Sequence, residues 1–267
     1  GLQLLGVRSN DLVIMPNVTF VASANAISYL GASPILIDID QATWQMDLDL
    51  LESFLGSSCK LDGNNMLVHK KTKRKISALM IVHVQGSICD MDRLLAICQD
   101  YKLPLLEDAA EALGSIYKGQ YAGTIGDIGC FSLTASKTIT TGQGGIIVTN
   151  NSKLFKKIKI LKNQGIVGKS DGGNVKHVSV GYNFKFTNIQ AAMGLAQISS
   201  LKKRVIKLKK INNLYRKNLK NCKDIEILNF NLTKGEVPLW TDAYALRKRD
   251  ELIKFLKKNK IECRKFW

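Results

Sequence analysis

Short apolar segments alternate with amphipathic segments along the first half of this chain. The expected strands are nearly continuous apolar runs, and the helices expected between them carry apolar residues on one face. Strands that are apolar throughout are buried on both faces, which is typical of a mostly parallel sheet covered by helices. The pattern predicts an α/β fold in which a mixed, mostly parallel sheet lies between helices. The expected strands are 12–15, 34–38, 78–82, 103–106, 129–133 and 145–149, and the expected helices are 21–30 and 90–101.

A long helix is expected to begin after Thr187, which has the spacing of a capping box with Gln190. Apolar positions recur at helical spacing over 187–208, so one helix is expected to lead from a large domain into a smaller one. The elements expected beyond it are a strand at 225–228 and a helix at 250–258. We therefore predict a large domain over residues 1–200, and a linking helix with part of a small α+β domain over residues 201–267.

The composition is that of an ordinary soluble protein, with 45% hydrophobic residues and a mean hydropathy of −0.03. No apolar run is long enough to span a membrane, and the first residues lack the pattern of a signal peptide. We expect a cytoplasmic protein without a membrane partner. The six cysteines are scattered and the three histidines do not cluster with them, so we expect free thiols, mostly buried, and no metal site.

The formal net charge of the chain is +17. Such a charge is compatible with a nucleic acid, an acidic membrane surface or an anionic small substrate as partner, and also with lysines that decorate solvated helix faces. The lysines are spread along the chain, and the only dense block, 70–75, is expected to be a surface loop between a helix and a strand. Because no recognisable nucleic-acid motif accompanies this block, we expect no nucleic-acid partner.

Two residues of opposite charge follow expected strands. Asp108 comes at the end of the apolar strand 103–106, and Lys137 lies just past the strand 129–133. Ligands bind outside the carboxyl ends of parallel strands, so both residues are expected near one site. Pyridoxal phosphate (PLP) requires an amine that bonds its aldehyde carbon and moves protons, and a carboxylate that keeps its ring nitrogen protonated. Asp108 has a second interpretation as the cap of the next helix, and Glu107 is expected to point to the opposite face.

Hydroxyl groups gather just before the lysine, at Ser132, Thr134 and Ser136. Such groups are suitable partners for the phosphate of PLP. The loop 140–145 lacks the spacing of a Walker phosphate-binding loop, and its glycines are expected to allow a tight turn beside the lysine. An aromatic ring that would stack on the cofactor is Phe20, which follows the first strand, and simple packing in the core is the other interpretation of this residue.

Several longer segments form a set that extends over nearly the whole chain. They are 16–22 (PNVTFVA), 83–86 (HVQG) with 90–92 (DMD), 107–114 (EDAAEALG), 126–132 (GDIGCFS), Lys137, 142–145 (GQGG), and 181–183 (GYN) with 187–192 (TNIQAA). In this order and spacing they resemble the DegT/DnrJ/EryC1/StrS family of sugar aminotransferases. The run 137–142 (KTITTG) is most similar to perosamine-synthase-type members, which aminate C4 of a nucleotide-linked 4-keto-6-deoxysugar.

The resemblance implies a role for each matching residue. Lys137 would hold PLP covalently, Asp108 would bind the ring nitrogen, and Glu111 would lie near the ring hydroxyl. Phe20 would stack on the ring, and Ser132 would contact the phosphate. The implied fold is the aspartate-aminotransferase type, which is fold type I of the PLP-dependent transferases.

The resemblance also implies the partners. Asn183 would reach the cofactor phosphate of the neighbouring subunit, because sites of this family are shared across a homodimer. The amino donor would be glutamate, the acceptor a nucleotide-linked keto-deoxysugar, and the product would serve surface polysaccharide such as lipopolysaccharide. Family members carry an S-G-T-type loop that should lie just before Gly1, and their small domain continues beyond residue 267, so the chain resembles a member truncated at both ends.

Other functions remain open beside the aminotransferase. A PLP-dependent sugar dehydratase of the same family would have histidine in place of the lysine, or closely spaced cysteines for an iron–sulfur cluster. Lys137 and the scattered cysteines favour the aminotransferase. A non-catalytic or regulatory protein that keeps the fold is a second alternative, and a nucleic-acid-binding module, based on charge alone, is a third.

Overall fold

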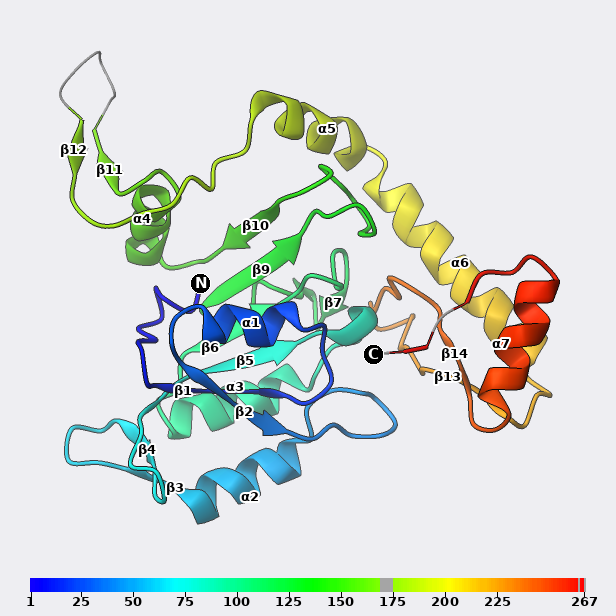
Figure 1. The fold of residues 1–267 in the computed structure, drawn as a ribbon, viewed down its shortest axis with the longest axis horizontal. Helices are drawn as coiled ribbons and strands as arrows, with labels where there is room; N and C mark the ends of the chain where they lie inside the picture. Colours follow the sequence, from blue (N-terminus) through cyan, green and yellow to red (C-terminus); the bar gives the residue numbers. More distant parts are fainter. Residues whose placement is uncertain (169–174, 264, 267) are drawn as a thin grey trace.

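The computed structural model describes residues 1–168, 175–263 and 265–266, and a six-stranded sheet lies at its centre (Figure 1). The strand order across this sheet is β10-β9-β6-β5-β1-β2. The strands from β9 to β2 pair in parallel, and β10 at the edge is antiparallel to β9. The predicted mixed, mostly parallel α/β sheet is confirmed. The strands are β1 Leu12–Pro16, β2 Ser33–Ile37, β5 Ile76–Val82, β6 Leu105–Asp108, β9 Ile128–Ser132 and β10 Gly145–Val148.

Alternate residues of the strands fill two cores on opposite faces of the sheet. Ile14 of β1 points to one face and packs in the same core as Leu55 of α2 and residues of α3. Its neighbour Val13 points to the other face and packs in the same core as Ile27 of α1. Both faces are thus covered, as near-continuous apolar strands require. The helices of this part are α1 Ala22–Ser28, α2 Leu48–Ser58, α3 Met91–Asp100 and α4 Ser152–Leu161.

Several elements are not among those predicted, whereas β13 Ile225–Ile227 corresponds to the strand predicted at 225–228. The helices α2 and α4 begin at side-chain caps, since Asp47 and Asn151 each accept hydrogen bonds from two backbone N–H groups. The short strands form two-stranded pairs outside the central sheet. They are β3 Cys59–Leu61, β4 Leu67–His69, β7 Ile116–Tyr117, β8 Gln120–Tyr121, β11 Ile166–Val167, β12 Lys176–His177, β13 Ile225–Ile227 and β14 Ala243–Ala245, and a 3₁₀ turn, η1, spans Val84–Gly86.

The dense basic block 70–75 follows a strand, so the predicted position between a helix and a strand is wrong. The block is the turn that leads from β4 to β5. Its Arg74 is not a solvated charge, because its guanidinium donates hydrogen bonds at 2.7 to 3.0 Å to Asn10 O, Asp11 O and Ser33 Oγ. This part of the charge therefore ties surface segments of the fold together.

The helix predicted over 187–208 is broken in two. Thr187 and Gln190 exchange side-chain and backbone hydrogen bonds, so the predicted capping box is confirmed. The break falls at Ser199 and Ser200, and the Ser200 hydroxyl donates to a carbonyl oxygen of the preceding turn at 2.8 Å. The expectation of one continuous helix is therefore wrong. The two helices are α5 Asn188–Ile198 and α6 Leu201–Leu219.

The C-terminal region, 201–267, lies at one end of the molecule (Figure 1). It contains α6, the β13–β14 pair and the helix α7 Arg249–Lys258, which is the α+β content that the sequence predicts. The division into domains 1–200 and 201–267 stays a prediction. No helix in the described part of the chain is long and apolar enough to cross a membrane.

An extended segment ties this C-terminal region to the end of the sheet. The Leu239 N–H donates to Gln85 O at 2.8 Å, and the Val237 N–H donates to Ser115 Oγ at 2.9 Å. Gly86 has a φ of 97°, and a Cβ atom at this position would lie 2.0 Å from the Val237 carbonyl oxygen. Only glycine permits this close approach, so the tie depends on Gly86.

Replacement of Leu55 by alanine is expected to lower the free energy of unfolding by about 2 to 5 kcal/mol, because Leu55 is fully buried against the sheet and its loss leaves a cavity. Leu50 lies on the same helix and is 47% exposed, so Leu50→Ala is the matched control, with an expected cost below about 1 kcal/mol. Urea unfolding measures both variants, and equal losses would contradict the packing described here.

Candidate active site

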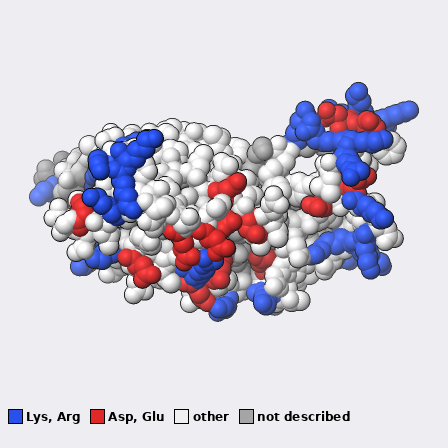
Figure 2. Space-filling model, turned by 90° about the horizontal axis from the view of Figure 1, so that it is seen from below, with Lys and Arg blue, Asp and Glu red and all other residues white. Residues whose placement is uncertain are grey.

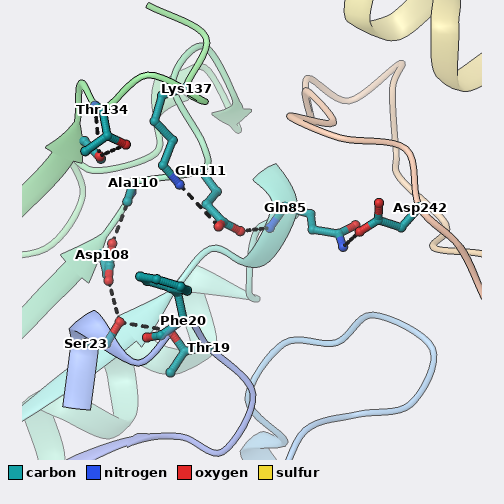
Figure 3. Close-up of polar contacts among 11 residues, drawn as sticks. Thr19, Phe20, Ser23, Gln85, Asp108, Ala110, Glu111, Thr134, Lys137 and Asp242 are labelled. Atoms are coloured by element: carbon teal, nitrogen blue, oxygen red, sulfur yellow. Dashed lines mark hydrogen bonds and ion pairs between the residues drawn. The ribbon is translucent and has the colours of Figure 1, made fainter. Parts of the chain in front are cut away.

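The ends of β6 and β9 bring three charged residues together: Asp108, Glu111 and Lys137 (Figure 3). The Lys137 Nζ atom lies 3.4 Å from Glu111 Oε1. Both side chains are largely sequestered from water, with 13% of Lys137 and 6% of Glu111 exposed. The structure therefore places the Lys137 amine next to Glu111, beyond the carboxyl ends of parallel strands, and its role there stays a prediction.

Glu111 is held in place from its other side by Gln85. The Gln85 backbone N–H donates to Glu111 Oε2 at 2.7 Å from the turn η1. Burial raises the pKa of the Glu111 carboxyl, against the opposing effects of the Gln85 N–H and the Lys137 charge. The Gln85 side-chain amide donates at 2.7 Å to both Asp242 Oδ2 and Tyr244 Oη, so one residue links the site to the C-terminal region.

Trp240 of the C-terminal region forms a further contact of the lysine. The Lys137 Nζ atom lies 4.9 Å from the centre of the Trp240 ring, which is within the range of a cation–π interaction. Trp240 follows Leu239, the residue whose N–H bonds the Gln85 carbonyl oxygen. The hydrogen bond between Leu239 and Gln85 thus holds the Trp240 ring next to the Lys137 amine.

Asp108 is oriented by two hydrogen bonds. Its Oδ2 atom accepts from Ser23 Oγ at 2.7 Å, and its Oδ1 atom accepts from the Ala110 N–H at 3.1 Å. The second bond agrees with the interpretation of Asp108 as a cap of the following turn, and the first fixes the carboxylate toward α1. Thr19 supports Ser23 through a hydroxyl–hydroxyl contact of 2.9 Å. The carboxylate is half-buried and keeps a defined orientation.

Glu107 points to the opposite face, as predicted. Its carboxylate is fully buried and lies 2.9 Å from His83 Nε2. It also accepts hydrogen bonds from three backbone N–H groups, those of Gly123, Ile125 and Gly126. Burial by itself would raise the pKa of Glu107, but the His83 hydrogen bond and the backbone donors hold it below its usual value. Glu107 therefore has a structural role.

The hydroxyl groups before Lys137 divide into two sets. Ser132 Oγ and Thr134 Oγ1 lie 3.2 Å apart and are half-buried, whereas Ser136 is exposed. The following loop folds back as predicted, because the Leu133 N–H donates to Gly144 O and Gly144 has a φ of 128°. Ser132 and Thr134 thus form one half-buried hydroxyl pair, and the role implied for Ser132 at the cofactor phosphate stays a prediction.

Phe20 lies below Glu111 and beside Asp108 in Figure 3. It is 55% exposed, so its interpretation as a core residue is wrong. The ring also lines a hollow of about 410 Å³ between the end of β1, the start of α1 and Leu36. An aromatic face next to a carboxylate and an amine fits a planar aromatic ligand.

Asn183 does not join this group in the single chain. It lies in the exposed segment before α5, where its backbone pairs with Asn163 at the end of α4. No hydrogen bond of the described residues connects it to Lys137, Glu111 or Asp108. The role implied for Asn183 in a neighbouring subunit stays a prediction.

The cysteines have no part in the site. Within the described ranges no three His, Cys, Asp or Glu side chains form a group that could hold a metal ion. All six cysteines are free thiols, and the pKa of Cys89 and Cys98 is raised to about 12, chiefly by burial. Cys222 is exposed and Cys130 and Cys263 are half-buried. Burial of the thiols, as predicted, is therefore found for Cys59, Cys89 and Cys98 and not for the other three.

These side chains fit the donor set that PLP requires: an amine, an oriented carboxylate, hydroxyls and an aromatic face. The sequence profile of the DegT/DnrJ/EryC1/StrS aminotransferase family matches residues 1–267. The chain belongs to this family. The family predicted from the motifs is thereby confirmed.

The chain is similar to curated members of the family. GDP-perosamine synthase of Escherichia coli O157:H7 is 39% identical over 219 residues, which are 82% of this chain and 55% of that protein. GDP-perosamine synthase of Caulobacter vibrioides is 35% identical over 275 residues, covering 99% of this chain and 67% of that protein. The chain thus spans about half to two thirds of the length of these relatives.

Solved structures of the family share the fold. The structure of S. venezuelae DesV superposes with a TM-score of 0.82 at 26% identity, covering 98% of this chain and 66% of that chain. The PLP form of Spr1654 from Streptococcus pneumoniae, described as a sugar aminotransferase, gives a TM-score of 0.79 at 27% identity, covering 97% and 67%. The predicted fold type is confirmed by these likenesses.

Some site residues have no signal in the sequence. Gln85 lies within the family-like segment 83–86, so the sequence marks this position but does not indicate its contacts with Glu111 and Asp242. Ser23, Trp240 and Asp242 show no local pattern that marks them. They reach the site only through tertiary contacts, over separations of 85 residues for Ser23 with Asp108 and 157 for Asp242 with Gln85.

Replacement of Glu107 by glutamine is expected to cost about 3 to 5 kcal/mol of stability at neutral pH, because a buried carboxylate that lies 2.9 Å from His83 and accepts three backbone hydrogen bonds is lost. The pKa of folded Glu107 lies below its usual 4.5, so the stability that the carboxylate contributes is present above pH 4.5 and is lost as the pH falls through the folded-state pKa. Urea unfolding at a series of pH values should show the difference between the two proteins shrinking in acid. A difference that stays constant below pH 4.5 would contradict this role.

Proposed function

We propose that the protein is a PLP-dependent sugar aminotransferase, which moves an amino group from glutamate to the keto carbon of a nucleotide-linked deoxysugar. The observation that carries the proposal is the sequestered amine of Lys137, 3.4 Å from Glu111 and on the same side of the sheet as the oriented carboxylate of Asp108. This set occurs in a chain of the aminotransferase family. The PLP form of Spr1654, a related structure, supports the choice of cofactor.

Each site residue has a definite task in this proposal. PLP, when bound, supplies the electron sink that permits amino-group exchange. Lys137 would hold the cofactor and, as a free amine, would take up and return a proton at Nζ. Asp108 would accept a hydrogen bond from the protonated ring nitrogen of the cofactor and keep it protonated, and Ser132 would bind the phosphate. Glu111, fixed by the Gln85 N–H, orients the lysine amine near the ring hydroxyl.

The acceptor sugar follows from the relatives. Two GDP-perosamine synthases, at 39% and 35% identity, are similar to this chain, and the run 137–142 resembles that type. A nucleotide-linked 4-keto-6-deoxysugar is therefore the proposed acceptor. The aminated product would serve surface polysaccharide, with lipopolysaccharide as the proposed example.

The assembly is part of the proposal. We expect a homodimer in which Asn183 contributes to the neighbouring site, because Asn183 lies in an exposed segment with exposed apolar neighbours, including Phe184 at 71%. Glutamate and a nucleotide-linked sugar are charged molecules of the cytoplasm, so a cytoplasmic location remains our expectation.

Addition of PLP to the purified chain is expected to give a visible absorption band, because the Lys137 amine bonds the cofactor aldehyde. Lys137→Ala should lack the band, and Lys118→Ala, whose side chain is 70% exposed, should keep it. Glutamate should then remove the band as the amino group moves to the cofactor. A folded protein without any Lys137-dependent band would overturn the proposal and favour the non-catalytic alternative.

Replacement of Asp108 by asparagine is expected to leave the absorption band but to slow its loss on adding glutamate by about 100-fold to 1,000-fold, because the ring nitrogen loses its charged partner. Ser23→Ala removes only one hydrogen bond of that carboxylate and should slow the step far less. Stopped-flow absorbance measures both rates. Equal rates for Asp108→Asn and the unchanged protein would contradict the role of Asp108 at the ring nitrogen.

A further inference from the structure

The positive charge of the chain is concentrated in its C-terminal region, contrary to the expectation of evenly spread lysines. Residues 201–267 contain 20 of the 39 lysines and arginines but 7 of the 22 acidic residues. This quarter of the chain thus carries 13 of the 17 formal charges. Figure 2 shows basic side chains at that end of the molecule, with some acidic ones among them, a second basic group at the opposite end, and further acidic side chains near the middle.

The helix α6 carries the most regular part of this charge. Lys203, Lys207, Lys210, Leu214 and Lys217 follow one another at spacings of four and three residues, so they form one stripe along the helix. All five are exposed. The stripe is about 21 Å long at the rise of an α-helix.

The stripe has no internal counter-charge. The sequence of α6 contains no acidic residue, and no ion pair of the four lysines of the stripe occurs among the described residues. Lysines three and four residues apart on a helix repel one another, and an external anionic surface would relieve this repulsion. The helix α7 differs, because there Lys248 and Arg249 pair with neighbouring carboxylates.

The choice of side chains favours a lipid surface over a nucleic acid. The two arginines of α6 face other protein segments, where Arg204 donates to Thr138 O and Arg216 to Phe230 O. The stripe itself uses lysine, a point charge suited to a diffuse anionic surface and not to paired recognition of phosphates. Ile206 and Leu214, at 59% and 48% exposed, lie among the lysines and offer apolar contact that the acyl boundary of a bilayer accepts and the backbone of a nucleic acid does not.

We propose that the exposed face of α6, formed by Lys203, Lys207, Lys210, Leu214 and Lys217, docks the protein on membrane surfaces that carry anionic lipid headgroups. The contact is peripheral: the lysines lie over the headgroup charges while Ile206 and Leu214 enter the interfacial layer. The Lys137 site lies outside this face and is not needed for the contact.

The test is flotation of the full chain with vesicles of phosphatidylcholine alone and of phosphatidylcholine mixed with phosphatidylglycerol. Binding is expected only to the anionic vesicles, and it should be lost in about 1 M salt, where the screening length is about 3 Å. The variant K203Q/K207Q/K210Q/K217Q should bind at least about 100-fold more weakly, since each lysine near an anionic surface contributes a factor of about five.

The matched control removes four exposed lysines from α4, in the variant K153Q/K156Q/K157Q/K159Q, and keeps the same net charge change. This variant should keep most of the binding. Equal losses in the two variants, or equal binding to neutral vesicles, would overturn the proposal. Binding of a single-stranded RNA oligomer, with no vesicle binding, would assign the stripe to nucleic acid and overturn it as well. If the α6 variant loses its circular dichroism signal of folded protein, the double variant K203Q/K210Q replaces it, with an expected loss of about 25-fold.

Discussion

The buried carboxylate of Glu107 is the interaction on which the rest of the site depends. It bonds His83 at the end of β5 and three backbone N–H groups of the loop 123–126 before β9. An unpaired carboxylate in this place would be costly, so the ends of three neighbouring strands are held together. Strand alternation then turns the next residue, Asp108, to the other side, where it meets Ser23. A structural and a site carboxylate are thus adjacent in the chain.

The site is completed by a second connection, between the turn η1 and the C-terminal region. The main chain of Gln85 binds Glu111 through its N–H and Leu239 through its carbonyl oxygen. The same tie brings Trp240 to the Lys137 amine. A shift of the C-terminal region would therefore move the groups that contact Glu111 and Lys137 at the same time. The packing of the C-terminal region is thus coupled to the geometry of the site.

The parallel sheet and the residues at its strand ends could be predicted because they depend on local patterns. Apolar runs predict the strands, and Asp108 and Lys137 are found from their place after those strands. The break between α5 and α6 was missed because two serines interrupt an apolar pattern that continues through them. Trp240 and Ser23 could not be predicted, since only tertiary contacts over long separations bring them to the site. Phe20 had two interpretations, and its exposure excludes the core.

One sequestered lysine, Lys137, in a chain rich in exposed lysines, is proposed to hold the cofactor. The most direct measurement is reduction of the PLP-loaded chain with borohydride, which fixes the cofactor to the lysine that holds it, followed by peptide mapping. The label is expected on Lys137 at one cofactor per site, with little elsewhere. A label spread over the exposed lysines of 201–267, with Lys137 unmodified, would contradict this assignment.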